Sequence, residues 1–534
     1  MDNIMDRFFN TAGPTKTDIN YYISSFERVD YEEIEMLIRS QRYFVLHAPR
    51  QTGKTSALLE IMDRINSEGK YNCVYANIEA GQALRGDVDR AIPTICGSIA
   101  SSINNYLGDS HVKKWYDENF KKVESGDLLR QLLEYWVTNS SKPCIMFLDE
   151  VDALVGDTLI SLLRQIRAGY AGRPYSFPQS MILCGVRDVR DYRIHTKDNE
   201  IITGGSAFNI KAESLTIGNF TYKECQELYQ QHTDYTGQKF DKRIFPHLWE
   251  DTKGQPWLVN ALGHELTWKE RELRDRTKEI TLEHYFRARE RLIYSRATHL
   301  DQLIDKLKEP RVHRVIAPIL ANKTSDNLHY NDRDLEYVSD LGLITRKPSV
   351  KIANKIYQET IPRELTIAKQ QSITNQDILW YKREDNSIDM VKLLKAFQQF
   401  FRENADSWIE RFDYKEAGPQ LLLQAFLQRI VNGGGRINRE YGLGRKRTDI
   451  LIEYPLDKEM GFWGETQKIV IETKILYSNL KKTIEKGIEQ TLEYADMIGA
   501  DESHLIIFDR SADMKWEDKI WDKRDESGVM IWGS

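Results

Sequence analysis

An apolar run leads directly into a glycine and lysine turn at residues 43–55, which read Tyr43-Phe44-Val45-Leu46-His47-Ala48-Pro49-Arg50-Gln51-Thr52-Gly53-Lys54-Thr55. The apolar part predicts a buried strand, and a helical pattern follows over residues 55–66. Backbone N–H groups at the start of such a helix cradle phosphate oxygens, with Gly53 permitting close approach. Lys54 would place positive charge beside the phosphates, and Thr55 would offer a hydroxyl to Mg²⁺. The stretch therefore predicts a phosphate-binding loop, which comprises Ala48, Pro49, Arg50, Gln51, Thr52, Gly53, Lys54 and Thr55.

A second apolar strand, residues 145–148, supplies the other half of this site by ending in Asp149 and Glu150. Asp149 would hold Mg²⁺ through water, and Glu150 would polarise the attacking water. The two strand ends together predict ATP and Mg²⁺ as cofactors. ATP is favoured over GTP because no Asn-Lys-x-Asp pattern for guanine occurs. The loop departs from the usual pattern only at Ala48, where a first glycine is expected, and that position mainly serves the turn.

The chain around this site alternates short apolar strands with longer helical segments, which is typical of a parallel α/β sheet. Residues 221–309 are helical in pattern. Residues 310–365 predict a helix over 312–321, a second helix that ends near residue 344, and a basic extended stretch, as in a winged helix. Such a module reads DNA in some proteins and only packs in many ATPases, and packing is the favoured interpretation. The predicted fold is a multidomain α/β chain: a P-loop ATPase domain (1–215), a helical lid (216–309), a winged-helix-like domain (310–385) and a C-terminal α/β domain (386–534).

The C-terminal part carries a second set of acidic strand ends. Asp449 lies at the start of a strand predicted over residues 448–454, and Glu472-Thr473-Lys474 ends a strand predicted over 468–475. Residues two apart in a strand face the same side, so Glu472 and Lys474 should converge while the Thr473 side chain points away. Asp449 and Glu472 would ligate Mg²⁺, with the Thr473 carbonyl as a further oxygen, and Lys474 would orient or activate water. This pattern predicts a metal-dependent site that cleaves phosphodiesters, although ion pairing on an exposed strand is the usual origin of such a triplet.

The N-terminal half resembles the AAA-like and STAND-type P-loop ATPases over roughly residues 20–290. The resemblance is carried by Tyr21-Tyr22-Ile23, Arg28, Asp30, the phosphate-binding loop, residues 147–152 and Gly254-Gln255-Pro256-Trp257-Leu258. In that class a Gly-x-Pro at a lid helix touches the nucleotide, which the resemblance implies for Gly254 and Pro256. Arg164, Arg167 and Arg187 are candidates for stabilising transition-state charge, and for each of them an ordinary solvated arginine is the favoured interpretation.

The C-terminal part resembles the restriction-endonuclease-like PD-(D/E)XK nuclease superfamily over roughly residues 410–512, which implies a nuclease domain over 386–534. The matching order is a helix (421–431), three strands (436–441, 448–454 and 468–475), a helix (480–498) and a strand (504–508). Gln490 and Tyr494 match the Gln-x-x-x-Tyr of an exonuclease-like branch, which implies Gln490 as a catalytic residue. Glu416 and Glu440 could add an acidic group. Thr448 stands where many members have proline. The basic segments 433–439 and 444–447 would suit phosphate contacts, and an ordinary solvated basic loop is an equally favoured interpretation of them.

Composition limits the partners. Formal net charge is -6 over 534 residues, so contact with nucleic acid must come from local basic patches. The five cysteines form no CxxC pair, the N-terminus has no signal-like segment, and no run of 18 apolar residues occurs. We therefore expect a cytoplasmic protein with no membrane partner, buried cysteines and several domains.

Taken together, these patterns predict an ATP-regulated, Mg²⁺-dependent nuclease that acts as a homo-oligomer on nucleic acid, with DNA favoured. One alternative is a STAND-like oligomerising sensor or scaffold whose C-terminal domain binds nucleic acid or a partner without cleavage. A DNA-repair motor is less favoured because helicase motifs beyond the P-loop and acidic strand are missing. Defence against phage or other foreign DNA is a further hypothesis, which equal plating of phage on cells with and without the gene would contradict.

Overall fold

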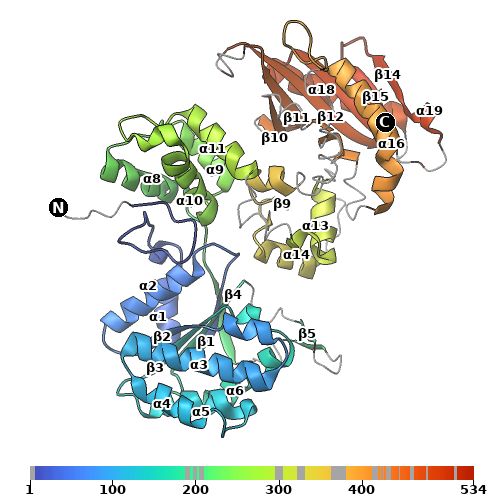
Figure 1. Cartoon of the computed structure of the whole chain (residues 1–534). Helices are drawn as coiled ribbons and strands as arrows, with labels where there is room; N and C mark the ends of the chain where they lie inside the picture. The colour runs from blue at the N-terminus through green and yellow to red at the C-terminus, as the bar shows by residue number, and fades with distance from the viewer. Residues whose placement is uncertain are drawn as a thin grey trace. The chain divides into compact units, whose positions relative to one another are not determined.

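The computed structural model divides the chain into two compact units: Met1–Asp301 with Glu336–Thr345, and Gln302–Leu335 with Arg346–Ser534. Their elements are labelled in Figure 1. The described residues are 7–186, 193–195, 201–203, 210–294, 305–320, 331–361, 380–411, 419–420, 422–424, 426–427, 435–443, 446–457, 462, 464–476, 479–509, 511 and 514–534. Within these, no helix combines the length and apolarity needed to cross a membrane. All five cysteines are buried and unbridged, as expected.

The first unit is built on a parallel sheet in the order β2-β3-β4-β1-β7. Its strands are β1 (Tyr43–His47), β2 (Asn72–Asn77), β3 (Cys144–Asp149), β4 (Ser180–Gly185) and β7 (Lys211–Thr216). A small antiparallel pair, β5 (Arg193–His195) and β6 (Ile201–Thr203), precedes β7. The predicted parallel α/β sheet is therefore confirmed. The carboxyl ends of β1 and β3 lie at the same edge, which places the phosphate-binding loop beside Asp149.

Helices cover both faces of this sheet (Figure 1). On one face, α1 (Tyr31–Arg39) and α2 (Lys54–Ser67) bury side chains such as Ile34 and Ile61 against Phe44 and Phe147. On the other face lie α3 (Val88–Leu107), α5 (Ser125–Thr138) and α6 (Gly156–Gly169), with α4 (Ser110–Asn119) packed on α3. Because both faces are buried, β1, β3 and β4 are continuous apolar runs rather than alternating ones.

A helical segment follows the sheet. It comprises α8 (Tyr222–Thr236), α9 (Ile244–Thr252), α10 (Pro256–His264), a π-helix (Glu265–Lys269) and α11 (Leu282–Tyr294). The N-terminal strand-like segment ties these helices to α2. Tyr22 bonds Gln231 of α8 through both its backbone groups, and its hydroxyl donates to Glu60 of α2 at 2.6 Å. Phe9 is buried among the rings of Tyr21 and Tyr229. This segment therefore joins the helical part to the helix that begins at the phosphate-binding loop.

The region predicted as a winged helix contains α13 (Pro310–Leu320), α14 (Asp332–Asp340) and the short strands β8 (Ile344–Thr345) and β9 (Lys351–Ile352). The second helix ends four residues earlier than predicted. Gly342 has φ +76°, a value that residue types other than glycine rarely adopt. The Leu343 N–H donates back to the Val338 carbonyl at 3.2 Å. Ile344 therefore begins a strand. The winged-helix assignment itself stays a prediction.

The second unit contains a mixed sheet in the order β10-β11-β12-β13-β15-β14. Its strands are β10 (Arg436–Leu443), β11 (Lys446–Pro455), β12 (Thr466–Leu476), β13 (Glu502–Asp509), β14 (Trp521–Arg524) and β15 (Met530–Gly533). β10, β11 and β12 are antiparallel neighbours, whereas β12 and β13 are parallel and joined through α18 (Leu480–Ile498). The predicted strands and the helix over 480–498 are confirmed as elements. Most of the predicted helix over 421–431 lies outside the described residues, and residues 422–424 and 426–427 of it are helical.

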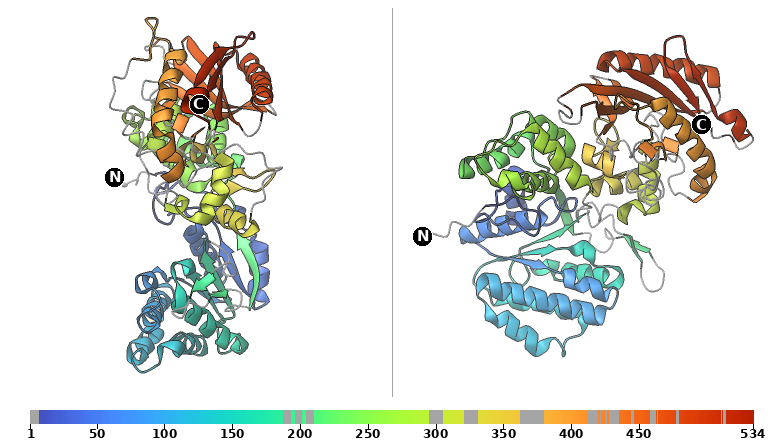
Figure 2. Two further views of the ribbon diagram at one scale, coloured as in Figure 1. Left: turned by 90° about the vertical axis from the view of Figure 1, so that its right-hand side faces the viewer. Right: turned by 45° about the horizontal axis from the view of Figure 1, so that its top comes forward.

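Two helices lie on opposite faces of this sheet, as Figure 2 shows in its left view. Ile484 and Ile488 of α18 pack against Leu505 and Ile507 of β13. From the other side, α16 (Met390–Arg411) places Phe397 and Phe401 against Phe508, with ring centroids 6.3 and 5.4 Å apart. A short helix, α19 (Trp516–Lys519), precedes β14. The alternation of side chains along β13 thus defines an α18 face and an α16 face.

We predict that Gly254→Ala destabilises the first unit much more than Gly237→Ala. Both glycines have positive φ, +72° and +78°, and an alanine there costs roughly 1–2 kcal/mol in backbone strain. Only at Gly254 would the new Cβ also lie 1.8 Å from a carbonyl oxygen, that of Phe220; at Gly237 nothing lies within 4 Å. The free energy of unfolding should fall by about 3 kcal/mol or more for Gly254→Ala. Equal losses in the two variants, measured by urea denaturation, would contradict this explanation.

Candidate nucleotide and nuclease sites

The phosphate-binding loop has the backbone that its sequence requires. Gly53 has φ +89° and precedes the first residue of α2, and Gln51 also lies in the left-handed region at +58°. The Lys54 ammonium turns into the loop and donates to the carbonyls of Ala48 and Pro49 at 3.0 and 3.1 Å. Ala48 has no positive φ and is buried, so its position does not need a glycine.

Asp149 and Thr55 meet although 94 positions separate them in the chain. The Thr55 hydroxyl donates to Asp149 Oδ2 at 2.7 Å, and the Tyr75 hydroxyl donates to the same oxygen at 3.1 Å. The Glu150 N–H donates to Asp149 Oδ1 at 2.9 Å. A hydroxyl beside a fully buried carboxylate is the donor set that Mg²⁺ takes together with waters and phosphate oxygens. The residues present therefore fit a Mg²⁺–nucleotide site.

Glu150 stands next to this carboxylate in a strained conformation, with φ +61°. Burial raises the pKa of Glu150, and the carboxylates of Asp152 and Asp149 raise it further, against the opposing effect of Lys54 and Arg50. A carboxyl with a raised pKa is a better proton acceptor, as the predicted role in polarising water requires. The geometry is compatible with that role, which stays a prediction.

The turn at Gly254 and Pro256 lies beside the loop, because the Gln255 amide between them donates to the Gln51 carbonyl at 3.4 Å. Pro256 is the first residue of α10. On the same side, the Arg28 guanidinium donates to the carbonyls of Thr52 and Gly218. Burial lowers the pKa of Arg28 to about 10, so it stays protonated near neutral pH. These contacts link the loop to the helical segment.

Two of the three candidate arginines can be placed, and neither has a described contact with this cluster. Arg164 and Arg167 lie on exposed positions of α6, and Arg187 lies outside the described residues.

In the second unit, the three predicted nuclease residues come together on β11 and β12. The Lys474 ammonium lies 2.7 Å from Glu472 Oε1, and the Asp449 N–H donates to Glu472 Oε2 at 3.4 Å. The Glu472 side chain is 4% exposed and that of Lys474 is 27% exposed. The structure therefore sets a buried carboxylate between a second carboxylate and a lysine that reaches solvent.

The surroundings of Glu472 favour its neutral form. Burial raises the pKa of Glu472 to about 7, with a further contribution from the Asp449 carboxylate, and Lys474 only partly offsets them. Two carboxylates in one buried place repel each other unless a proton or a cation is bound between them. This repulsion, with the oxygen-only donors of Asp449 and Glu472, fits a divalent cation such as Mg²⁺.

Thr473 behaves differently from its prediction. Its hydroxyl and its N–H both donate to Asp449 Oδ2, at 2.7 and 2.8 Å, so its side chain does not point away from the site. The regular pairing of β11 with β12 runs only as far as Ile450 opposite Ile471, and beyond it the Asp449 carboxylate folds over the β12 backbone. The amide of Gln420 approaches the Thr473 hydroxyl at 3.5 Å from behind.

Gln490 is exposed on α18, and no described hydrogen bond joins it to Asp449, Glu472 or Lys474. The helix that carries Gln490 nevertheless packs on the face of β12 from which Glu472 and Lys474 project. Val470 packs with Tyr494 of α18, and the alternation of β12 places Glu472 and Lys474 on the same side as Val470. Gln490 lies one turn before Tyr494. Glu416 lies outside the described residues, and so does the side chain of Glu440.

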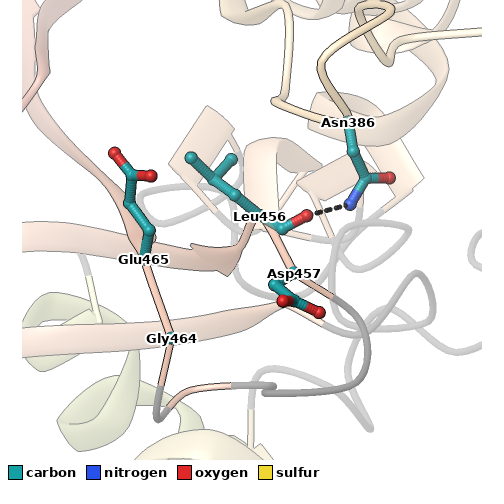
Figure 3. A pocket seen from close by; sticks show the side chains of 5 residues that line it. All are labelled: Asn386, Leu456, Asp457, Gly464 and Glu465. Atoms are coloured by element: carbon teal, nitrogen blue, oxygen red, sulfur yellow. Dashed lines mark hydrogen bonds between the residues drawn. The ribbon is translucent and has the colours of Figure 1, made fainter.

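A hollow of about 680 Å³ lies elsewhere in this unit (Figure 3). Asn386, Leu456, Asp457, Gly464 and Glu465 line it, and the Asn386 amide donates to the Leu456 carbonyl at 2.8 Å. It lies where β11 ends and β12 begins. Asp449 is seven residues earlier along β11, or roughly 20 Å away. The hollow is therefore separate from the carboxylate pair.

A parallel sheet with a phosphate-binding loop after its first strand, and with the loop threonine bonded to an acidic strand end, defines a P-loop ATPase. The AAA-like domain family matches residues 10–361, well over half of the chain. The chain therefore belongs to the AAA-like domain family.

Solved structures share this fold only distantly. The Walker-type ATPase of Pyrococcus abyssi is 14% identical with a TM-score of 0.46, over 66% of this chain and 99% of that one. The ORC1 protein of Aeropyrum pernix, solved in complex with DNA, is 12% identical with a TM-score of 0.33, over 68% and 95%. The RuvB branch migration motor of Thermotoga maritima is 12% identical with a TM-score of 0.32, over 62% and 92%. Similarities this low support no argument about function. No curated protein matches the chain.

Sequence reasoning missed three contributors to these sites. In the sequence, Tyr75 is an ordinary aromatic residue of an apolar strand, and Gln255 occupies the variable position of Gly-x-Pro. The Thr473 hydroxyl is expected on the face of its strand that points away from the site. Each acts through a contact with a distant residue: Asp149, Gln51 and Asp449. A polar side chain within an apolar strand, as Tyr75 is, was the only available signal.

We predict that Glu472→Gln stabilises the chain at alkaline pH when EDTA removes divalent cations. The folded pKa of Glu472, about 7, exceeds its ordinary value of 4.5. The folded chain therefore keeps a proton that the unfolded chain has released, and this contribution to stability is lost as pH rises through 7. The variant should exceed wild type by on the order of 1–3 kcal/mol at pH 8 and by much less at pH 5.

The measurement is urea denaturation at both pH values. Glu485→Gln, at an exposed position of α18, is the matched control and should show the same difference from wild type at each pH. A pH-independent effect of Glu472→Gln would contradict the buried carboxylate pair.

Proposed function

We propose that this ATPase is an ATP-regulated, Mg²⁺-dependent nuclease that cleaves phosphodiester bonds, with DNA as its substrate. The observation that carries the proposal is the convergence of Asp449, Glu472 and Lys474 on adjacent strands, with one carboxylate buried against the other. A buried carboxylate beside a second, half-buried one lowers stability unless a proton or a cation is bound, so a purely structural origin for the pair is unfavourable. The order β10, β11, β12, α18 and β13 supports the same proposal.

Each residue of the proposed nuclease site would have a role that follows from its position. The carboxylates of Asp449 and Glu472 and the Thr473 carbonyl would hold Mg²⁺. The bound ion would neutralise phosphate charge and lower the pKa of a coordinated water. Thr473 holds one oxygen of Asp449 through two donors, which fixes the direction of that carboxylate. Lys474 reaches solvent from the same face, so its ammonium can contact a phosphate oxygen or the attacking water.

The ATPase part would control this site. Lys54 leaves its contacts with the Ala48 and Pro49 carbonyls when phosphates take their place, and the loop is bonded to the helical segment through Gln255 and Arg28. Nucleotide binding can therefore change the position of the helical segment through these hydrogen bonds. A nuclease that is present in the same cell as the host's own DNA would damage that DNA unless its activity is controlled. For this reason we propose regulation by ATP rather than two independent activities.

We predict that Lys474→Ala abolishes DNA cleavage while leaving ATP hydrolysis intact. Removing the ammonium deletes both the partner of Glu472 and the cation that faces the phosphate, and loss of one such group lowers rates by about 10²–10⁴-fold. Plasmid and linear DNA, and RNA of the same sequence, are incubated with Mg²⁺ and ATP. Lys468→Ala is the matched control, because Lys468 lies at the other end of the same strand.

Cleavage that survives Lys474→Ala, or no cleavage by wild type with any of these substrates, would sink the nuclease proposal. The second outcome would instead favour the sensor or scaffold alternative, in which the C-terminal domain binds nucleic acid or a partner without cutting it.

We further predict that Lys54→Ala abolishes ATP hydrolysis and changes the rate of DNA cleavage. The lysine supplies the charge that the β and γ phosphates need, so the variant should neither bind nor respond to ATP. Cleavage is measured with and without ATP for the variant and for wild type. Identical cleavage rates in all four conditions would contradict ATP control and leave the nuclease assignment standing.

A further inference from the structure

Tyr75 lies on β2, the edge strand of the parallel sheet, and contacts Asp149 at the carboxyl end of the neighbouring β3. It pairs with Phe147 in register and points to the same face of the sheet as α2, the helix that begins with Lys54 and Thr55. Its ring is 8% exposed and meets Tyr106 edge-on, with centroids 6.4 Å apart. Its hydroxyl donates to Asp149 Oδ2 at 3.1 Å.

The Asp149 carboxylate is held by three donors from three elements. Oδ1 accepts the Glu150 N–H, and Oδ2 accepts the hydroxyls of both Thr55 and Tyr75. The two hydroxyls are not equivalent. The Thr55 oxygen is itself a predicted metal ligand, so its orientation changes when a cation binds. Tyr75 has no part in the predicted ligand set, and its contact with Asp149 can persist in both states.

We propose that Tyr75 is a positioning residue of the ATPase, which keeps the Asp149 carboxylate oriented toward Mg²⁺ while Thr55 turns to the ion. It acts through Asp149 and is not itself a ligand. A carboxylate already oriented loses less conformational freedom when its site is filled, so metal binding is stronger. The proposal rests on the ATPase class alone and is independent of the nuclease site.

The surroundings of Tyr75 suit a permanent donor. Its side chain is buried, and its hydroxyl lies 3.1 Å from Asp149 Oδ2. Its ring is also held on both sides, by the sheet and by Tyr106. A rigid aromatic donor defines direction better than a flexible side chain, because fewer rotamers are lost in forming the bond.

The test compares Tyr75→Phe with Tyr43→Phe. The control removes another buried tyrosine hydroxyl from the same sheet, one that donates to the Pro178 carbonyl at 2.8 Å near the amino end of β1. ADP binding is measured by calorimetry in EDTA and over a series of Mg²⁺ concentrations, together with steady-state ATP hydrolysis. Tyr75→Phe should leave ADP affinity in EDTA unchanged and raise the Mg²⁺ concentration for half-maximal effect by about five- to tenfold, which is the range of one net hydrogen bond.

Hydrolysis by Tyr75→Phe should recover toward the wild-type kcat as Mg²⁺ is raised, with KM for ATP at saturating Mg²⁺ unchanged. Tyr43→Phe should lower thermal stability without moving the Mg²⁺ dependence. In a background of Asp149→Asn, Tyr75→Phe should have no further effect on Mg²⁺ dependence, because the two residues act as one unit.

Three results would overturn the proposal. The first is an unchanged Mg²⁺ dependence in folded Tyr75→Phe. The second is a shift of equal size in Tyr43→Phe, which would indicate a general loss of stability. The third is failure of Tyr75→Phe to fold where Tyr43→Phe folds, since a positioning role requires that the hydroxyl be dispensable for folding.

Discussion

The hydrogen bond between the Thr55 hydroxyl and Asp149 joins the two halves of the nucleotide site, and it depends on how the parallel sheet is buried. β1 and β3 are not neighbours in the sheet, because β4 lies between them. Their carboxyl ends meet at one edge because both strands pair in parallel with β4, and the helices on both faces bury this sheet. The core around Phe44, Phe147 and Ile61 is therefore a condition for the chemistry.

In the second unit, the repulsion between two neighbouring carboxylates is the interaction on which the site depends. Asp449 and Glu472 lie together where β11 and β12 leave their regular pairing, and Thr473 fixes one carboxylate over the strand of the other. Burial raises the pKa of Glu472, and the Asp449 carboxylate beside it raises the pKa further. Both units thus present a carboxylate that is oriented by hydroxyl donors from the protein, Thr55 and Tyr75 in one case and Thr473 in the other. Such donors hold the ligand direction and leave its remaining oxygen lone pairs for a cation.

Local patterns were enough to predict most elements. β1 lies in the apolar run that predicted it, and α18 begins and ends where predicted, because a strand or helix that buries one or both faces must repeat its apolar residues at a fixed spacing. The helix before Ile344 was predicted too long, because its apolar pattern continues past the turn at Gly342. Gln490 shows that a motif does not determine the contacts of a predicted site residue. The motif places Gln490 on α18, but the packing of α18 on the sheet leaves its side chain exposed.

The sequence by itself determined the phosphate-binding loop, the acidic strand ends and the strand and helix order, since each depends on neighbouring residues and their period. Tertiary structure alone decided which distant groups hold the two carboxylates: Tyr75 from the edge strand and the Thr473 hydroxyl from a strand that should have turned it away. Hydrogen bonds of this kind depend on distances between chain segments that no local pattern encodes. Their directions follow from packing and strand register, and these exist only when the whole chain is folded.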